Sequence, residues 1–314
     1  MRRLILAVTV ALVVVPPASA SQLLDRNATN VRLKVSRDGK AMVSYRAHGR
    51  AWSVLAWGAI NAMHPTTARK QVRFRIDRAG GWGTFGRKLR FPNACQPYDG
   101  PPLVHLVVAC KAPDGSYWAI QRWRRLLPNL GFAPWTPTQR AWALHLSHWS
   151  GPLAVLEGYT DWSWHGRFHH IFGRLTYRGR PVHGFRTSRH GARLDKFGRA
   201  VYLDTFGSRH GRGWRRENSF VTHRPTGVFC YTFRARNARK GGYAHPPGYR
   251  GGMRGPGNGL AYRMTVEGPG VTPDIKWQAK GLPRFNPHAP ALVAHEDAMN
   301  VRLDQLNDRL CRKH

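Results

Sequence analysis

Short runs of alternating apolar and polar residues, separated by Gly, Pro, Asp and Asn, follow one another along most of the chain. A period of two is typical of strands with one face towards a core, and the separating residues favour tight turns. Residues 31–35 and 41–46 alternate on either side of the turn sequence RDGK at 37–40, and a second turn is expected at PDG, residues 113–115. The pattern predicts a mainly β protein, an antiparallel sandwich or paired sheets with long loops.

The centre of the chain, residues 149–233, contains the hairpin that can be predicted in most detail. Residues 167–177 and 180–187 read as strands joined by a two-residue turn at Arg178-Gly179. In that register Phe172 is expected to pair with Phe185, and alternation separates two faces. The face expected to join the core carries Ile171, Leu175, Tyr177 and Val182. The other face carries His170, Phe172, Arg174, His183 and Phe185.

This second face of the hairpin mixes aromatic rings with cations, so two interpretations apply. It is either a contact surface or a face covered by another layer, with its histidines satisfied by hydrogen bonds. Antiparallel sheets commonly bury one face or both, which favours the covered face.

The C-terminal segment has a different period. Residues 289–313 show helical spacing of apolar residues, with acids near the start and basic residues at the end, as the helix dipole favours. We therefore expect residues 286–314 to form a helix docked on a β-rich domain of residues 21–285 through Leu303, Leu306 and Leu310. The prolines at 128–138 suggest an internal boundary there, with a crossing loop inside one domain as the alternative.

The N-terminus has the pattern of a secretory signal peptide. Met1-Arg2-Arg3 is basic, residues 4–15 form an apolar run too short to span a membrane, and Ala18-Ser19-Ala20 is a cleavage signal of the A-x-A type. No later run of 18 or more apolar residues follows, so no membrane span is expected in the mature chain. Residues 1–20 are therefore predicted to be removed, and the protein is expected to be secreted, extracellular or associated with the cell wall.

The cysteines support an oxidising destination. Their number is even, and two disulfides are expected in an exported chain. Of the three connectivities that four cysteines allow, we favour Cys95 with Cys110 and Cys230 with Cys311, because each pair is close in sequence or fixes a terminus. A zinc site is the alternative, but C-x-x-C spacing is absent. Neither a metal nor a cofactor is expected.

The charge balance changes the functional picture most. The chain has 50 Lys and Arg against 16 Asp and Glu, and without Arg2 and Arg3 the excess is 48 − 16 = 32 positive charges. A high-GC genome would explain why Arg outnumbers Lys, but it does not explain the shortage of acids. An anionic partner would explain the net charge: a cell-wall polymer, an acidic polysaccharide or extracellular DNA.

The expected contact surface lies in the central stretch, where aromatic and basic residues are interleaved. Its predicted members are Trp162, Trp164, His170, Arg174, His183, Arg186, Trp214, Arg215 and Arg216. Neutralising Arg174, Arg186, Arg215 and Arg216 is expected to reduce the salt dependence of binding more than neutralising the Arg residues near 32–50.

A hydrolase is the alternative, because two carboxylates at a suitable separation can hydrolyse a glycosidic bond. The candidates are Glu157, Asp161, Asp204 and Glu217. In an Arg-rich protein, however, scarce acids also serve as ion-pair partners that hold strands in register. The motifs H-E-x-x-H, G-x-S-x-G and the phosphate loop are absent. The sequence thus predicts a secreted, non-catalytic protein that binds an anionic extracellular or cell-wall polymer, with a carbohydrate hydrolase as the alternative; ligand identity and oligomeric state stay open.

Overall fold

Strands dominate the computed structural model, and every strand pairing among the described residues is antiparallel. The structure describes residues 21–60, 74–82, 91–124, 141–163, 166, 168–182, 185–187, 193–195, 201–206, 215–218, 221–223, 226–233, 261–266, 268–307 and 311. The predicted fold class, mainly β with one C-terminal helix, is confirmed.

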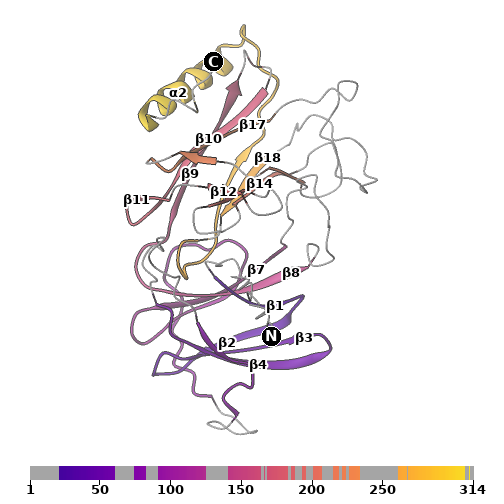
Figure 1. The fold of residues 1–314 in the computed structure, drawn as a ribbon, viewed down its shortest axis with the longest axis vertical. Coiled ribbons are helices and arrows are strands. Elements are labelled where there is room, and N and C mark those ends of the chain that lie inside the picture. Colours follow the sequence, from indigo (N-terminus) through magenta and orange to yellow (C-terminus); the bar gives the residue numbers. More distant parts are fainter. Residues whose placement is uncertain are drawn as a thin grey trace, which may run out of the picture.

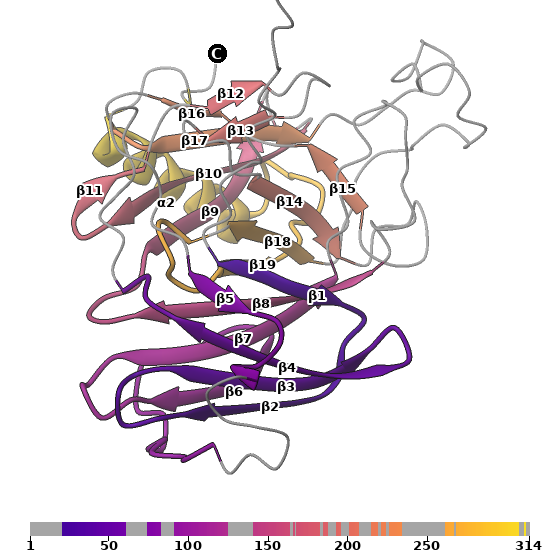
Figure 2. The same cartoon turned by 60° about the horizontal axis from the view of Figure 1, so that its bottom comes forward.

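Two sheets from the first half of the chain form what we call the N-terminal sandwich (Figures 1 and 2). One sheet has the order β2 (Thr29–Val35), β3 (Ala41–Ala47), β4 (Arg50–Trp57) and β5 (Arg75–Asp77). The other has the order β1 (Gln22–Arg26), β8 (Trp142–Trp149), β7 (Tyr117–Arg124) and β6 (Leu106–Lys111). Val43 and Val54 of the first sheet share a core with Trp118, Ile120 and Leu144 of the second.

The strands on either side of residues 125–140 pair with each other along their whole length, from Tyr117↔Trp149 to Arg124↔Trp142. The segment 128–138 itself lies outside the described residues. It joins β7 to β8, two neighbouring strands of one sheet.

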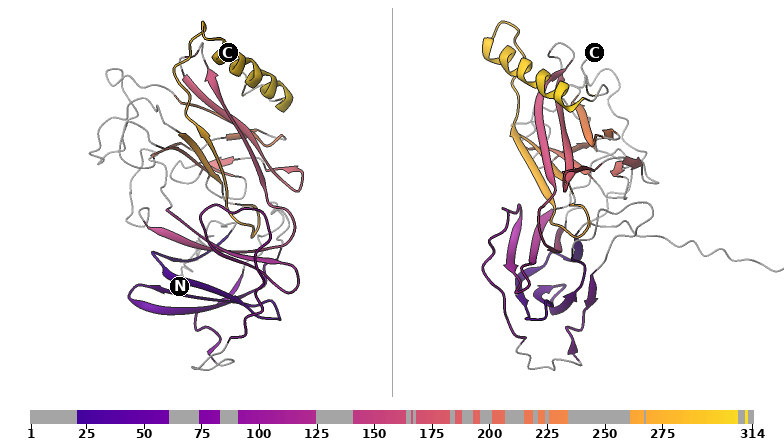
Figure 3. Two further views of the ribbon diagram at one scale, coloured as in Figure 1. Left: turned by 180° about the vertical axis from the view of Figure 1, so that it is seen from behind. Right: turned by 90° about the vertical axis from the view of Figure 1, so that its left-hand side faces the viewer.

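The second half of the chain forms two further sheets, which we call the C-terminal sandwich (Figure 3). One sheet contains β9 (Val155–Ser163), β10 (Phe168–Tyr177), β11 (Arg180–Pro181), β16 (Val221–His223) and β17 (Val228–Phe233), with β9 and β17 both paired to β10. The other has the order β15 (Arg215–Asn218), β14 (Val201–Phe206), β18 (Ala261–Val266) and β19 (Ile275–Lys280). A separate two-stranded ladder pairs β12 (Phe185–Thr187) with β13 (Arg193–Asp195).

Apolar residues of β10 and β17 meet those of β18 and β19 in the core of this second sandwich. Ile171, Leu175 and Phe229 pack in one cluster with Tyr262 and Met264. Close approach of the sheets requires a residue without a side chain at Gly158 on β9. A Cβ there would lie 2.5 Å from the ring of Trp277 on β19, so the ring occupies the space that any larger residue would need.

The central hairpin is confirmed at its turn and wrong further along. Tyr177 pairs with Arg180 across the predicted turn, and the predicted apolar face is buried. The expected pairing of Phe172 with Phe185 is wrong: Phe172 lies opposite Tyr159 on β9 and Cys230 on β17, and Phe185 pairs with Asp195. Pro181 has no amide hydrogen to donate, and β17 supplies a longer ladder to the same edge of β10. His183 lies outside the described residues.

Helix α2 (Pro290–Leu306) packs on β9 and β10 (Figures 1 and 3). Leu303 is 3% exposed and shares a cluster with Phe172, while Leu306 is half-buried against the same cluster. Leu310, the third leucine expected to dock, lies outside the described residues. The predicted match to the helix dipole is wrong, because the first turn contains no acid and the last turn no basic residue. The helix instead begins with Pro290, whose missing amide hydrogen costs nothing in the first turn.

Both predicted disulfides are confirmed. Cys95 is bonded to Cys110 and Cys230 to Cys311, each with a Cα–Cα distance of 5.5 Å. The first bond fixes the segment that precedes β6 to that strand, and the second joins β17 to the chain after α2. Among the described residues, no helix combines the length and the apolar character needed to cross a membrane.

Candidate functional site

The first two candidate carboxylates lie on β9 and face basic partners on β10. Cross-strand pairing sets Asp161 opposite His170 and Glu157 opposite Arg174. The Asp161 Oδ1 to His170 Nδ1 distance is 2.6 Å, and these side chains are 0% and 4% exposed. Arg174 Nε donates to Glu157 Oε2 at 3.2 Å near the surface. Both acids therefore hold β9 and β10 in register, as the ion-pair interpretation expects.

These two carboxylates do not have the separation of a glycosidase pair. Glu157 and Asp161 lie four residues apart on one strand, which corresponds to about 13 Å at roughly 3.4 Å per residue. Retaining enzymes need about 5–5.5 Å and inverting enzymes about 6.5–9.5 Å between the carboxyl groups.

The other two candidate acids are described by their backbone alone. Asp204 on β14 lies opposite Arg216 on β15 and Arg263 on β18, so both of its register neighbours are arginines. Glu217 lies at the irregularity where the β14–β15 register shifts.

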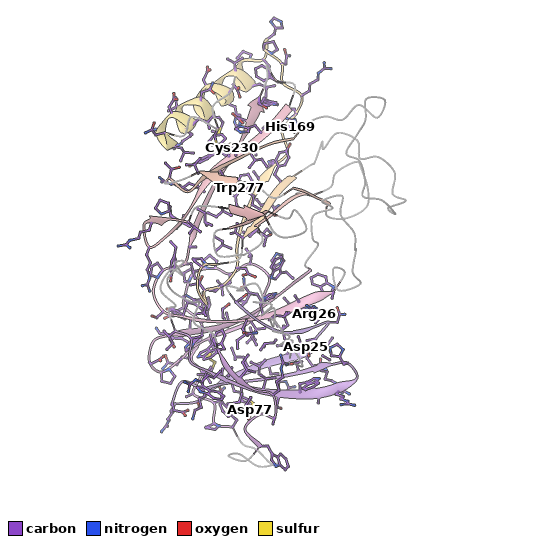
Figure 4. All side chains as sticks on the ribbon, in the orientation of Figure 1. Asp25, Arg26, Asp77, His169, Cys230 and Trp277 are labelled. Atoms are coloured by element: carbon purple, nitrogen blue, oxygen red, sulfur yellow. A yellow bond between two sulfur atoms is a disulfide. The ribbon has the colours of Figure 1, made fainter. Side chains whose placement is uncertain are left out.

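Trp162 and His170, two predicted contact residues, lie in the interior. Trp162 is 1% exposed, its Nε1 donates to the Pro283 carbonyl at 2.9 Å, and its ring contacts Phe285 and His295. On β10, α2 covers the face that carries His170 and Phe172, which is the covered-face interpretation of the hairpin. Figure 4 labels the neighbouring His169, whose Nδ1 contacts the Tyr262 hydroxyl on the opposite face.

The remaining predicted contact residues are not placed in full. Trp164, His183 and Trp214 lie outside the described residues. Arg186 lies on β12, and Arg215 and Arg216 lie on β15. Arg174 is half-exposed and paired with Glu157.

The outer face of the β2–β5 sheet gathers exposed cations that the sequence analysis did not select. Leu33 and Val35 point into the core, so alternation turns Arg32 and Lys34 outwards. Arg46 on β3 and Arg75 on β5 are exposed on the same side. We call the surface formed by these residues the basic sheet face: Arg32, Lys34, Arg46 and Arg75.

The carboxylates near the basic sheet face are already engaged. In the part of the chain that the structure describes, none of its four cations lies within ion-pair distance of a carboxylate. Asp77, labelled in Figure 4, faces the same way and accepts hydrogen bonds from the amides of Ala79 and Gly81 at 2.8 and 2.6 Å. Asp25 lies 2.9 Å from His48 Nε2. Among the described residues, the four cations of this face therefore have no carboxylate in direct contact.

Two groups of Ser, His and Asp, buried except for Asp114, were also missed by the sequence analysis. In the first, Ser116 Oγ lies 2.9 Å from His148 Nε2 and 2.6 Å from Asp114 Oδ1. His148 Nδ1 donates to the Gly58 carbonyl at 2.9 Å, so Nε2 carries no hydrogen in the neutral ring, and the single hydroxyl hydrogen of Ser116 is shared between Nε2 and Asp114 Oδ1. Burial lowers the pKa of His148 to about 4. Ser116 and His148 are inaccessible to a substrate, so this group stabilises the N-terminal sandwich.

The second group lies where the two sandwiches meet. Ser21 Oγ lies 2.9 Å from His145 Nδ1 and donates to Asp274 Oδ1 at 3.3 Å, and Trp123 Nε1 donates to Asp274 Oδ2 at 2.9 Å. The Gln121 side chain bonds both the amide and the carbonyl of Asp274, at 3.0 and 3.1 Å. No local sequence signal could have found this group, since its members are 124 and 253 residues apart.

Among the described residues, no cluster of three or more His, Cys, Asp or Glu side chains could hold a metal ion. No protein-family model, curated protein or solved structure matches this chain.

Proposed function

We propose that this protein is exported and binds an anionic extracellular or cell-wall polymer without catalysis, and that the polymer contacts the basic sheet face. One observation carries the proposal. The described carboxylates of the N-terminal sandwich contact other groups of the protein. The four cations of the basic sheet face, in contrast, have no carboxylate within ion-pair distance among the described residues. A partner that carries negative charge would supply the missing compensation.

The geometry of the face suits an extended, repetitive ligand. Arg32 and Lys34 lie two residues apart on one strand, about 7 Å at roughly 3.4 Å per residue. Arg46 lies diagonal to Arg32 across the ladder, since Arg32 pairs with Ser44 two residues away, and such diagonals are about 7–8 Å. Two nearly equal steps give a row of cations. A row of this kind favours a polymer with regularly repeated charge over a small molecule.

Two candidate carboxylates of the C-terminal sandwich count against a hydrolase. Asp161 is buried and bonded to His170, and Glu157 is paired with Arg174 about 13 Å along the strand at roughly 3.4 Å per residue. The paired cysteines are compatible with the oxidising destination that the N-terminal pattern predicts.

The test is retention of the mature protein on heparin, DNA and wall-polymer columns over a series of salt concentrations. We expect the protein to be retained at low salt, and the logarithm of its affinity to fall linearly with the logarithm of the salt concentration. On duplex DNA each lost phosphate contact reduces the slope by about 0.9. The variant Arg32→Gln/Lys34→Gln/Arg46→Gln should therefore reduce the slope by about 2–3, if each cation neutralises one phosphate.

A matched control removes three exposed arginines elsewhere, Arg178→Gln/Arg180→Gln/Arg284→Gln, and should leave the slope nearly unchanged. No retention at low salt, or equal retention on a neutral glucan, would remove polyanion binding altogether. If replacing Arg186, Arg215 and Arg216 reduced the slope more, polyanion binding would stand, but the contact surface would lie in the central stretch.

A further inference from the structure

Ser21 is the first residue after the predicted cleavage signal, and the structure places it in the interior. It is 1% exposed, and its two partners His145 and Asp274 are 1% and 3% exposed. A serine nitrogen lies about 3 Å from its own Oγ by covalent geometry. The Ser21 nitrogen therefore lies at most about 6 Å from Asp274 Oδ1, which is 3.3 Å from Oγ.

Removal of the leader changes the charge at this nitrogen. Hydrolysis adds water across the Ala20–Ser21 peptide bond, leaving a carboxylate on Ala20 and an α-amino group on Ser21. An α-amino group has an ordinary pKa of about 7.7–8.0 and is mostly protonated at neutral pH. A neutral amide near the Asp274 carboxylate thus becomes a cation.

We propose that the α-ammonium of Ser21, formed by export cleavage, makes an ion pair with Asp274 that fastens the N-terminal sandwich to the loop before β19. The inference rests on the proposed export and is independent of polymer binding. A buried carboxylate is costly unless charge and hydrogen bonds compensate it. Trp123 and Gln121 hold Asp274 in place, so the position of this carboxylate does not depend on the ammonium.

The groups around the new ammonium come from three elements. His145 of β8 and Asp274 of the loop before β19 contact the Ser21 hydroxyl, and Trp123 and Gln121 of β7 bond Asp274. Among these, Asp274 is the one carboxylate, so it is the group whose removal should abolish the effect.

The experiment compares two forms of the full mature chain, one with Ser21 as its first residue and one that keeps Ala18-Ser19-Ala20 in front of it. The form that begins at Ser21 should melt about 4 °C higher, as expected for a hydrogen-bonded charge in a chain of this size. Asp274→Asn should remove that difference. Asp38→Asn, in a surface turn, is the matched control and should preserve it.

The Asp274→Asn background separates a steric effect of the three added residues from an effect of the charge at Ser21. A difference that persists in the Asp274→Asn background would mean that the extension merely obstructs packing, and the ion pair would be rejected. If Asp274→Asn does not fold, amine labelling of the wild type decides: slow labelling of Ser21 relative to the unfolded chain supports the pair, and equal labelling rejects it. Mass analysis of the exported protein tests the cleavage itself, and a different N-terminus would overturn this inference while leaving the polyanion columns unaffected.

Discussion

At the scale of single residues, the scarce acids of this chain act mainly as internal partners. The described examples pair with bases, as in Asp25–His48, Asp38–Lys40 and Asp99–Lys111, or with hydroxyls, as in Asp114–Ser116. Burial raises the pKa of Asp114, but the hydrogen bonds from Ser116 outweigh it and the net pKa lies below the usual value. What matters for function is therefore which cations remain unpaired.

His148 should make stability fall in mild acid. Its pKa is about 4 in the folded protein, because burial opposes the charged ring, and about 6.5 when unfolded. Between these values the unfolded chain binds more protons, so the free energy of unfolding decreases as pH falls from about 6.5 towards about 4. The loss from this residue is about 3 kcal/mol. Chemical denaturation at several pH values measures it.

The control for this prediction is an exposed histidine. His148→Gln should be less stable than the wild type at pH 7, but its free energy of unfolding should change less between pH 7 and 4.5. His48→Gln, at an exposed ion pair, should show the same pH dependence of the free energy of unfolding as the wild type. Equal slopes for His148→Gln and the wild type would show that other groups cause the acid sensitivity.

At the scale of elements, packing partners decide what a predicted face does. The face of β10 that carries His170 and Phe172 has the composition of a contact surface, but α2 covers it. The second disulfide ties the chain after α2 to β17, the neighbour of β10. Helix and sheet are thus held together by both an apolar cluster and a covalent bond.

Leu303→Ala should lower stability by about 2–4 kcal/mol, because a fully buried leucine loses its contacts and leaves a cavity. The matched control Val301→Ala, on the same helix at 56% exposure, should change it by less than about 0.5 kcal/mol. Thermal melting of both variants is sufficient. Similar small changes in both would mean that α2 contributes little to the stability of the β body.

At the scale of the whole molecule, the net charge of +34 dominates. Charges of one sign repel one another, and this repulsion is relieved when the chain unfolds and the charges move apart. The compact state should therefore gain stability from whatever screens or neutralises the cations, including the proposed polymer.

Salt should accordingly raise the melting temperature. Increasing ionic strength from about 20 mM to about 300 mM shortens the screening length from roughly 20 Å to roughly 6 Å, which weakens repulsion between separate arginines. We expect a rise of several degrees by scanning fluorimetry, equal for sodium and choline chloride because screening does not depend on the cation. A melting temperature that falls with salt would show that attraction within ion pairs outweighs the net repulsion.

The sequence by itself determined the local features of this protein. Alternation predicted the β class, the turn at Arg178-Gly179 and the apolar face of β10, because strand periodicity is set by backbone geometry and is visible within a few residues. Cysteine spacing and number led to the observed disulfides, and the helical period led to α2.

Only the tertiary structure decided which segments meet. Any strand of suitable pattern can occupy the edge of β10, and the chain selects β17, so Phe172 meets Cys230 and not Phe185. The same holds for the burial of His170 and for the exposure of the basic sheet face. Ser21, His145 and Asp274 come together from distant positions because long-range pairing is fixed by the packing of whole sheets, which no local sequence window contains.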